Sequence, residues 1–163
     1  MNTAQNFAAQ YELVNEWLTG IVNGFGEDDW KLSLAPGKNH ALWLLGHLVA
    51  TVDDIILYLG KGDVLYPQYQ EIFSQGKPLL EYEKCPLASE LKESLRKVYD
   101  RNKLICAGLT EEEFDEPHAL VENYETDYFK TKRRVVMAWQ LHQSYHTGQL
   151  GAILSMAGKK IYG

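Results

Sequence analysis

The sequence predicts an all-α protein, a four-helix bundle with one long crossover connection. Four segments repeat apolar residues every three or four positions, the spacing that places them on one face of an α-helix. Few segments show the alternating pattern of strands. A connection from Lys61 to Pro86, interrupted by prolines and glycines, separates the second helix from the third and changes the order in which helices pack. We expect one domain over residues 1–163.

The first two helices are delimited by glycines. The first ends near Gly24, and its apolar face carries Phe7, Tyr11, Val14, Trp17, Leu18 and Ile21. The second follows Asn39, a residue type that caps helices, and ends at Gly60. Its apolar positions are Leu44, Leu45, Leu48, Val52, Ile55, Ile56 and Leu59.

The second half of the chain contains the other two long helices. Within the crossover only residues 68–74 have a pattern compatible with a helical turn. The third long helix has one stripe made of Leu87, Leu91, Leu95, Val98, Asn102 and Ile105. Thr110 and Glu113 then form a capping-box pattern that opens a short extra turn. A polar segment from Asp115 to Thr131 leads into the fourth helix, which runs from about Lys132 to Ala157 and stops at Gly158. Its stripe is expected to carry Val135, Ala138, Trp139, His142, His146, Gln149, Ile153 and Met156.

Composition excludes several classes of function. The net charge of −6 and the scattered Lys and Arg argue against a nucleic-acid surface. The short basic cluster at residues 132–134 is interpreted as a solvated helix start. Cys85 and Cys106 are expected to be reduced thiols. The N-terminus lacks the pattern of a secretory signal, and no window is expected to match a membrane span, so we predict a cytoplasmic protein without membrane contact.

Three histidines fall on core-facing stripes of two helices. His142 and His146 are four residues apart, which stacks them on one helix face with about 6 Å of axial rise between them. His47 lies on the stripe of the second helix. Two imidazoles from one helix and one from another can share a divalent ion and leave other positions open for water or substrate. The sequence therefore predicts a metal site at His47, His142 and His146, and these ligands allow Zn, Ni or Fe.

Polar neighbours extend this patch. Gln149 is interpreted as a hydrogen-bond partner outside the ligand set, because neutral amides bind transition metals poorly, and Thr51 is expected to have the same outer role. The competing interpretation is a set of hydrogen-bonded core histidines without an ion, since a His-x-x-x-His pair alone is weakly specific. His40 and His118 are expected at the surface or in caps.

Other metal architectures are excluded by missing motifs. Di-iron bundles need a Glu-x-x-His motif on each of two helices, and the chain has none. Gln143 stands where a zincin protease has its catalytic glutamate. A Cys-x-x-Cys-His haem-attachment motif is also absent.

Two segments, in this order, resemble the DinB-like (YfiT-type) four-helix bundle proteins. They are Trp-Leu-Leu-Gly-His-Leu at 43–48 and His-Gln-Ser-Tyr-His-Thr-Gly-Gln-Leu at 142–150. The resemblance implies a divalent-metal site at His47, His142 and His146, often in a homodimer. Some relatives are metal-dependent transferases or isomerases that use low-molecular-weight thiols such as mycothiol or bacillithiol, and many have no known activity. Many relatives carry an Arg in the turn where this chain has Leu154-Ser155-Met156.

Three functional hypotheses follow. The leading one is a metal-dependent enzyme in which the ion lowers the pKa of a small thiol, which then attacks a small-molecule electrophile. The second is a non-catalytic binding or stress-response module in which the same ion, or no ion, completes the bundle core. The third is a structural, dimerising bundle whose histidines bond to one another and to Gln149.

Overall fold

The computed structural model describes residues 2–123 and 128–161, so residues 124–127 of the predicted polar segment lie outside the described part. Its fold is all-α, as the sequence predicts. Four long helices form the bundle: α1 (Thr3–Gly24), α2 (Ala41–Leu59), α4 (Ala88–Gly108) and α6 (Lys132–Met156). Shorter helices lie in the connections: α3 (Pro67–Phe73), α5 (Glu111–Asp115) and the 3-10 helices η1 (Glu27–Lys31), η2 (Tyr82–Lys84) and η3 (Val121–Asn123).

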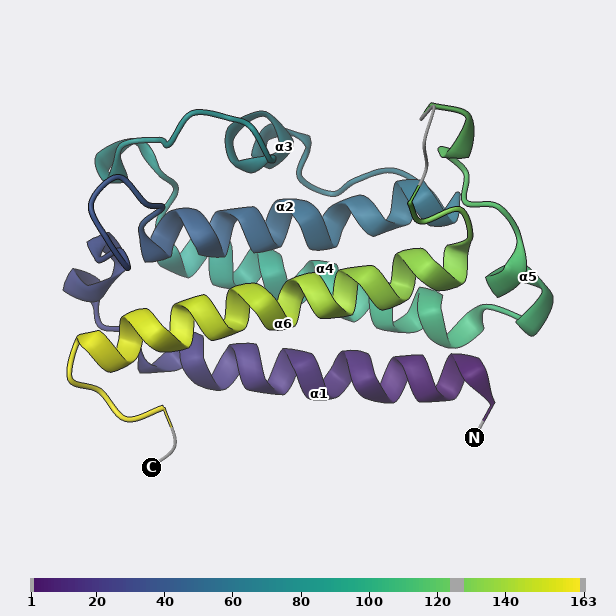
Figure 1. Ribbon diagram of the computed structural model, residues 1–163, viewed down its shortest axis with the longest axis horizontal. Helices are drawn as coiled ribbons and strands as arrows, with labels where there is room; N and C mark the ends of the chain where they lie inside the picture. The colour runs from purple at the N-terminus through teal and green to yellow at the C-terminus, as the bar shows by residue number, and fades with distance from the viewer. Residues whose placement is uncertain (1, 124–127, 162–163) are drawn as a thin grey trace.

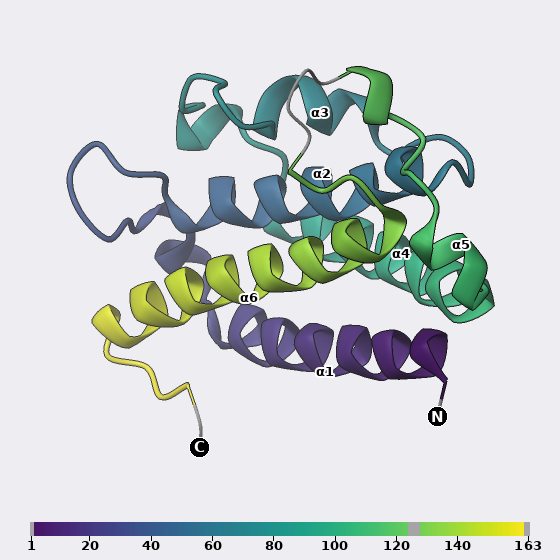
Figure 2. The same cartoon turned by 45° about the vertical axis from the view of Figure 1, so that its right-hand side comes forward.

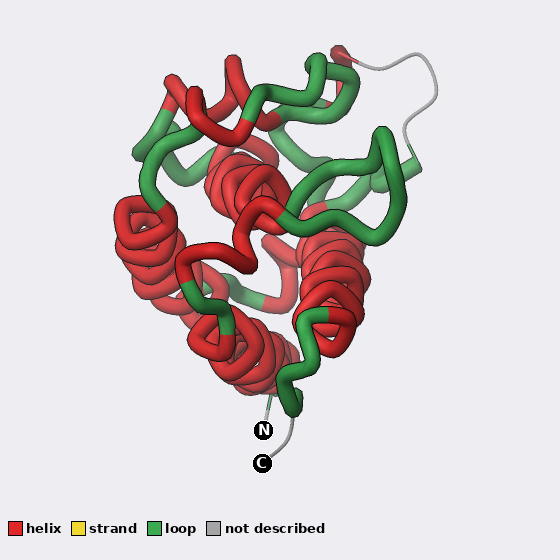
Figure 3. Tube along the Cα trace, turned by 90° about the vertical axis from the view of Figure 1, so that its left-hand side faces the viewer, coloured by secondary structure: helices red, strands yellow, loops and turns green. Residues whose placement is uncertain are grey.

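The four long helices pack in a non-sequential order. α1 packs against α4 and α6, and α2 packs against the same two helices, so α1 and α2 occupy opposite corners. Figure 1 shows α2 and α4 running in one direction and α1 and α6 in the other. Seen along the bundle, the long helices stand end-on with the connecting segments above them (Figure 3). The predicted crossover is therefore the link between two neighbouring helices that run in the same direction, α2 and α4.

α2 is the central helix of the core. His40, not Asn39 as expected, caps it, and the ring Nδ1 of His40 accepts a hydrogen bond from the backbone N of Trp43 at 3.0 Å. Gly60 ends it in the left-handed conformation, with φ of 65°. The expectation that no segment matches a membrane span is wrong, because α2 has the length and apolarity of one. Of its most apolar 18-residue window 78% is buried inside the bundle, which accounts for this composition.

Most predicted apolar faces point inward, with three exceptions at their margins. Trp17 is 54% exposed because it lies at the edge of the α1 stripe. Leu87 is 67% exposed because α4 begins one residue later and Leu87 only caps it. Met156 is 65% exposed at the last position of α6.

The crossover lies across α2 and contributes to the core. Figures 1 and 2 both place α3 and the segment that enters α6 on the same side of α2. The buried carboxylate of Asp53 accepts hydrogen bonds from the backbone N atoms of Leu65 and Tyr66, at 3.0 and 2.8 Å, and fixes the start of the crossover. Phe73 at the end of α3 is fully buried against α2.

Phe73 reaches α2 because residue 46 is glycine. A Cβ atom on Gly46 would come within 2.5 to 2.6 Å of the Phe73 ring. Real Cβ contacts are not that short, so Gly46 allows the crossover to lie directly on the helix. This close approach sets the position of His47, the next residue.

The ends of the last helices match the sequence patterns. Glu113 N donates to Thr110 Oγ1 at 3.1 Å and Thr110 N donates to Glu113 Oε2 at 2.9 Å, which is the predicted capping box. Gly158 has φ of 76° just after α6. The basic cluster at the start of α6 is not merely solvated, because Lys132 pairs with Glu116 and Arg133 with Asp115, both at 2.7 Å.

Candidate metal centre

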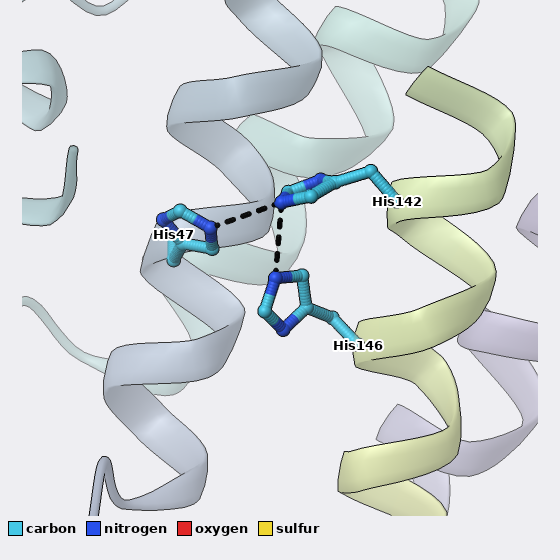
Figure 4. Close-up of side chains that lie close together, drawn as sticks. All are labelled: His47, His142 and His146. Carbon is cyan, nitrogen blue, oxygen red and sulfur yellow. Dashed lines mark hydrogen bonds between the residues drawn. The ribbon is translucent and has the colours of Figure 1, made fainter. Parts of the chain in front are cut away.

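Three imidazoles from two antiparallel helices converge at the centre of the bundle. His47 comes from α2, and His142 and His146 come from successive turns of α6 (Figure 4). The Nε2 of His142 lies 3.3 Å from the Nε2 of His47 and 3.0 Å from the Nε2 of His146. One nitrogen from each of the three residues lies within 4.8 Å of the other two. The structure thus brings together all three residues that the sequence proposes as ligands.

The outer nitrogens of two rings are fixed by oxygen acceptors. Nδ1 of His47 lies 2.7 Å from the backbone O of Phe73, and Nδ1 of His146 lies 2.7 Å from Oε1 of Gln149. Because these oxygens can only accept, each Nδ1 must carry the proton and each Nε2 keeps its lone pair. Such partners orient the ring and increase the basicity of a ligating nitrogen.

Of the two expected outer residues, only Gln149 contacts an imidazole. The hydroxyl of Thr51 donates to the backbone O of His47 at 2.8 Å and does not reach the ring. Sequence reasoning missed the carbonyl of Phe73, because a backbone oxygen contributed by a crossover has no side-chain signature. The glycine that precedes His47 is the local sequence signal that another segment packs closely on the helix here.

The hydrogen bonds among the rings are incomplete without a cation. Nε2 of His142 faces two nitrogens that already keep lone pairs, and a neutral imidazole has one N–H to donate. At most one of the two contacts can therefore be a hydrogen bond, and the other brings two lone pairs together. A divalent cation would satisfy all three nitrogens, so the donor set fits a metal such as Zn, Ni or Fe.

The surroundings keep the rings neutral. Burial, followed by the charges of His146 and His47, lowers the pKa of His142 to about 4. Burial lowers the pKa of His146 to about 4, although the hydrogen bond that His146 donates to Gln149 acts in the opposite direction. Burial also lowers the pKa of His47. Neutral imidazoles are the form that binds metal, so all three are ready to act as ligands at neutral pH.

A pocket of about 430 Å³ opens beside two of the rings. It is lined by His47, Thr51, Asp54, Tyr58, Ser74, Gln75, Phe129, Ala138, Trp139 and His142. From the sequence, the expected walls of such a pocket are the start of the second helix, the Lys61 to Pro86 crossover and the Asp115 to Thr131 segment. The crossover and the 115–131 segment do contribute walls, but α2 contributes its middle and end rather than its start. His146 does not line the pocket. An ion held by the three rings would therefore have access to the pocket past His47 and His142.

The remaining two histidines have other roles. His40 caps α2, which is one of the two roles expected for it, and its Nε2 lies 3.1 Å from the backbone O of Leu80. His118 is almost fully buried rather than at the surface, and its Nδ1 accepts a hydrogen bond from the backbone N of Leu120 at 3.2 Å. Both belong to the architecture of the connections and lie outside the cluster of three.

Comparison with known proteins agrees with this arrangement. Residues 10–150 match the DinB superfamily. The chain belongs to the DinB superfamily. A crystal structure of a conserved protein from Enterococcus faecalis superposes with a TM-score of 0.69 at 16% sequence identity, covering 96% of this chain and 97% of the other. At that identity the likeness concerns the fold alone. No match is found among curated proteins.

Membership in the DinB superfamily accounts for the order of parts along the chain. The matched region includes both the Gly-His step of α2 and the His-x-x-x-His pair of α6. The fold places them opposite each other on antiparallel neighbours, and the three rings could hold an ion there. Neither comparison specifies the metal or the reaction.

Proposed function

We propose that the chain is a divalent-metal-dependent enzyme that transfers a low-molecular-weight thiol to a small electrophile, or isomerises a substrate with its help. The observation that carries the proposal is the convergence of the Nε2 atoms of three histidines beside a pocket. The backbone O of Phe73 and the side-chain O of Gln149 fix the rings of His47 and His146 in the tautomer that leaves Nε2 able to bind a metal. A cytoplasmic location, where such thiols are reduced, belongs to the same proposal.

The three histidines position the ion, and the pocket walls surround the substrate. His47 and His142 face the pocket, while His146 is held from behind by Gln149. When bound, a divalent ion lowers the pKa of a thiol that coordinates it. His47, His142 and His146 would hold this ion. A thiolate favoured in this way would form the bond to the electrophilic carbon, the leaving group would depart with the bonding electron pair, and the thiol proton would pass to solvent. Three aromatic side chains, Tyr58, Phe129 and Trp139, contribute apolar wall to the pocket in which the substrate would lie.

Turnover with a chromogenic aryl halide and a small thiol such as cysteine tests the proposal. Protein purified without a nickel column and then loaded with zinc should accelerate release of halide, and His142→Ala should abolish the acceleration. Leu104→Ala on the exposed side of α4 serves as the matched control and should leave the rate unchanged. Metal binding without turnover for any of several thiols and electrophiles would contradict the enzymatic part.

One observation favours a second candidate, a structural bundle without an ion. The distances of 3.0 and 3.3 Å between ring nitrogens also suit hydrogen bonds among imidazoles. In that case, or if the protein is a stress-response module, the wild type would not accelerate halide release, and His142→Ala would change only the stability of the protein. The unpaired lone pair described above is the reason for preferring the metal site.

A further inference from the structure

The pocket beside the imidazoles is also lined by a carboxylate, that of Asp54. Asp54 lies seven residues after His47 on the same face of α2, and both line the pocket. At 1.5 Å of rise per residue the two positions are separated by about 10 Å along the helix. The pocket therefore extends from a candidate metal centre towards a carboxylate.

This carboxylate has no partner within residues 2–123 and 128–161. Its neighbour Asp53 shows the contrast, because Asp53 pairs with Arg101 at 2.8 Å and accepts two backbone hydrogen bonds. No hydrogen bond or ion pair involves Asp54 in that part of the chain, and no Lys or Arg is among the ten residues that line the pocket. Burial and the nearby charge of Asp53 raise the pKa of Asp54 to about 6, so it is ionised at neutral pH.

Three aromatic rings stand around the same part of the pocket. The ring of Trp139 lies 4.9 Å from that of Tyr58 and 5.4 Å from that of Phe129, measured between centroids. Tyr58 follows Asp54 by one helical turn, and Trp139 Nε1 donates to the backbone O of Thr51, almost one turn before Asp54. Asp54 is thus flanked along α2 by the contacts that hold the Trp139 ring.

A carboxylate without a partner and three aromatic side chains in one pocket are the combination that recognises an organic cation. The faces of Trp, Tyr and Phe carry negative potential and attract ammonium groups, and a carboxylate adds a full opposite charge. A neutral or anionic guest would gain nothing from this charge. The distance from His47 separates the cation subsite from the reacting end.

We propose that Asp54, with Tyr58, Phe129 and Trp139, forms a subsite for a protonated amine, so that the substrate class of this pocket is a small organic cation. The amine lies at Asp54 and the rest of the molecule extends towards His47 and His142. Assignment of that other end as the reacting end rests on the proposed function. Asp54 determines specificity in this arrangement and takes no part in bond making.

Binding of matched small probes tests the subsite. The probes are 2-phenylethylamine, which is cationic at pH 7.5, its neutral analogue 2-phenylethanol, and anionic phenylacetate, with binding followed by tryptophan fluorescence and NMR on the full chain. The wild type should bind the amine at least ten-fold more tightly than the alcohol. Asp54→Asn should remove that difference, while Asp28→Asn, which changes an exposed carboxylate on η1, should preserve it.

Two results would overturn the subsite. The first is seen in the wild type alone: equal affinity for the amine and the alcohol, or no binding of the amine up to millimolar concentration, would contradict the subsite. An amine preference that survives Asp54→Asn in a protein with native circular dichroism would do so as well. Comparison of probes on the wild type keeps the test decisive if Asp54→Asn fails to fold.

Zinc binding, measured separately, distinguishes this inference from the proposed function. Competition with a chromophoric chelator should give the same zinc affinity for the wild type and Asp54→Asn. Amine selectivity measured in chelator-treated protein does not depend on the ion. Failure of zinc binding with retained selectivity would contradict the metal-dependent function alone, and the opposite pattern would contradict the amine subsite alone.

Discussion

Gln149 and the carbonyl of Phe73 determine the tautomers of His146 and His47. Each accepts the Nδ1 proton of one histidine and so leaves Nε2 of that ring as a lone pair directed at His142. Gln149 is itself oriented, because its Nε2 donates to the hydroxyl of Tyr145 at 3.2 Å. The amide oxygen of Gln149 therefore faces His146, consistent with its role as an acceptor.

Replacement of Gln149 should weaken metal binding without removing a ligand. We expect Gln149→Ala to reduce zinc affinity by roughly 10- to 100-fold, the usual effect of losing a partner that orients a ligating histidine. Gln149→Glu retains an acceptor oxygen and should keep most of the affinity. Competition with a chromophoric chelator measures both. Equal losses in the two variants would contradict the role assigned to the amide oxygen.

Protonation of the histidines gives a second prediction, for the metal-free protein. His142 and His146 have pKa values of about 4 when folded and about 6.5 when unfolded. Between these values the unfolded chain binds more protons, so folding stability should fall as pH falls from about 6.5 to about 4. Above about 6.5 neither state is protonated and these residues have no effect on the pH dependence.

The double variant His142→Ala/His146→Ala isolates this effect. Asp54, whose pKa is raised to about 6, gives a slope of opposite sign in part of the same window, but it is present in both proteins. Urea denaturation with chelator at several pH values should show a smaller loss of stability on acidification in the variant than in the wild type. Parallel curves from pH 6.5 to 4 would contradict the lowered pKa values.

At the scale of elements, the packing of α3 on α2 connects the crossover to the site. Gly46 permits the close approach of Phe73, and the backbone of Phe73 then fixes His47. The glycine has no unusual backbone angle, so its role is space rather than conformation.

Gly46→Ala should therefore affect both stability and metal binding. The added methyl group would displace Phe73 and cost about 1 to 3 kcal/mol, as overpacking usually does, and zinc affinity should fall with the loss of the His47 hydrogen bond. Gly148→Ala on α6 is the control, since a Cβ there meets nothing within 4 Å and should stabilise the helix by about 0.5 to 1 kcal/mol. Thermal denaturation and zinc competition measure both. A stabilised Gly46→Ala with native affinity would contradict this link.

The helices were predictable because their signals are local. Apolar spacing lies within each element, and Gly24, Gly60 and Gly158 mark the ends of three of the four long helices. The capping box at Thr110 is equally local. The margins were less predictable, since the exposure of Trp17 and Leu87 depends on which neighbour covers the end of a stripe.

The site was predictable only in its ligand positions. Spacing on two helices indicates His47, His142 and His146, but the hydrogen-bond partner of His47 is Phe73 at the end of α3, 26 residues away in sequence. Thr51 was expected to support the ligands, yet its hydroxyl bonds to its own helix backbone, a local alternative common for threonine. Asp54 and its aromatic neighbours come together only through the antiparallel packing of α2 and α6.

At the scale of the whole molecule, one uncharged surface suits a second copy of the chain. A groove between α1 and α6 is lined by Phe7, Gln10, Leu13, Val14, Trp17, Met137, Gln140, Leu141 and Ser144, and none of these residues is charged. Two copies, each with a net charge of −6, repel each other least where the surfaces in contact carry no charge. We propose this groove as the interface of the homodimer implied by the resemblance.

A charge placed on this surface should prevent association. Leu141→Glu, at an exposed position of α6, should convert a dimer into a monomer in sedimentation velocity experiments. Leu104→Glu, at a comparably exposed position of α4 outside the groove, should leave the dimer intact. A monomeric wild type at all concentrations, or the same effect from both variants, would contradict the proposed interface.

X-ray absorption at the metal edge tests most directly whether the three histidines hold an ion. The measurement uses protein purified without a nickel column, with elemental analysis of the same sample. We predict one divalent ion per chain with three imidazole nitrogen donors, and loss of this signal in His142→Ala. Absence of a saturable ion, or an unchanged coordination spectrum in His142→Ala, would contradict the account.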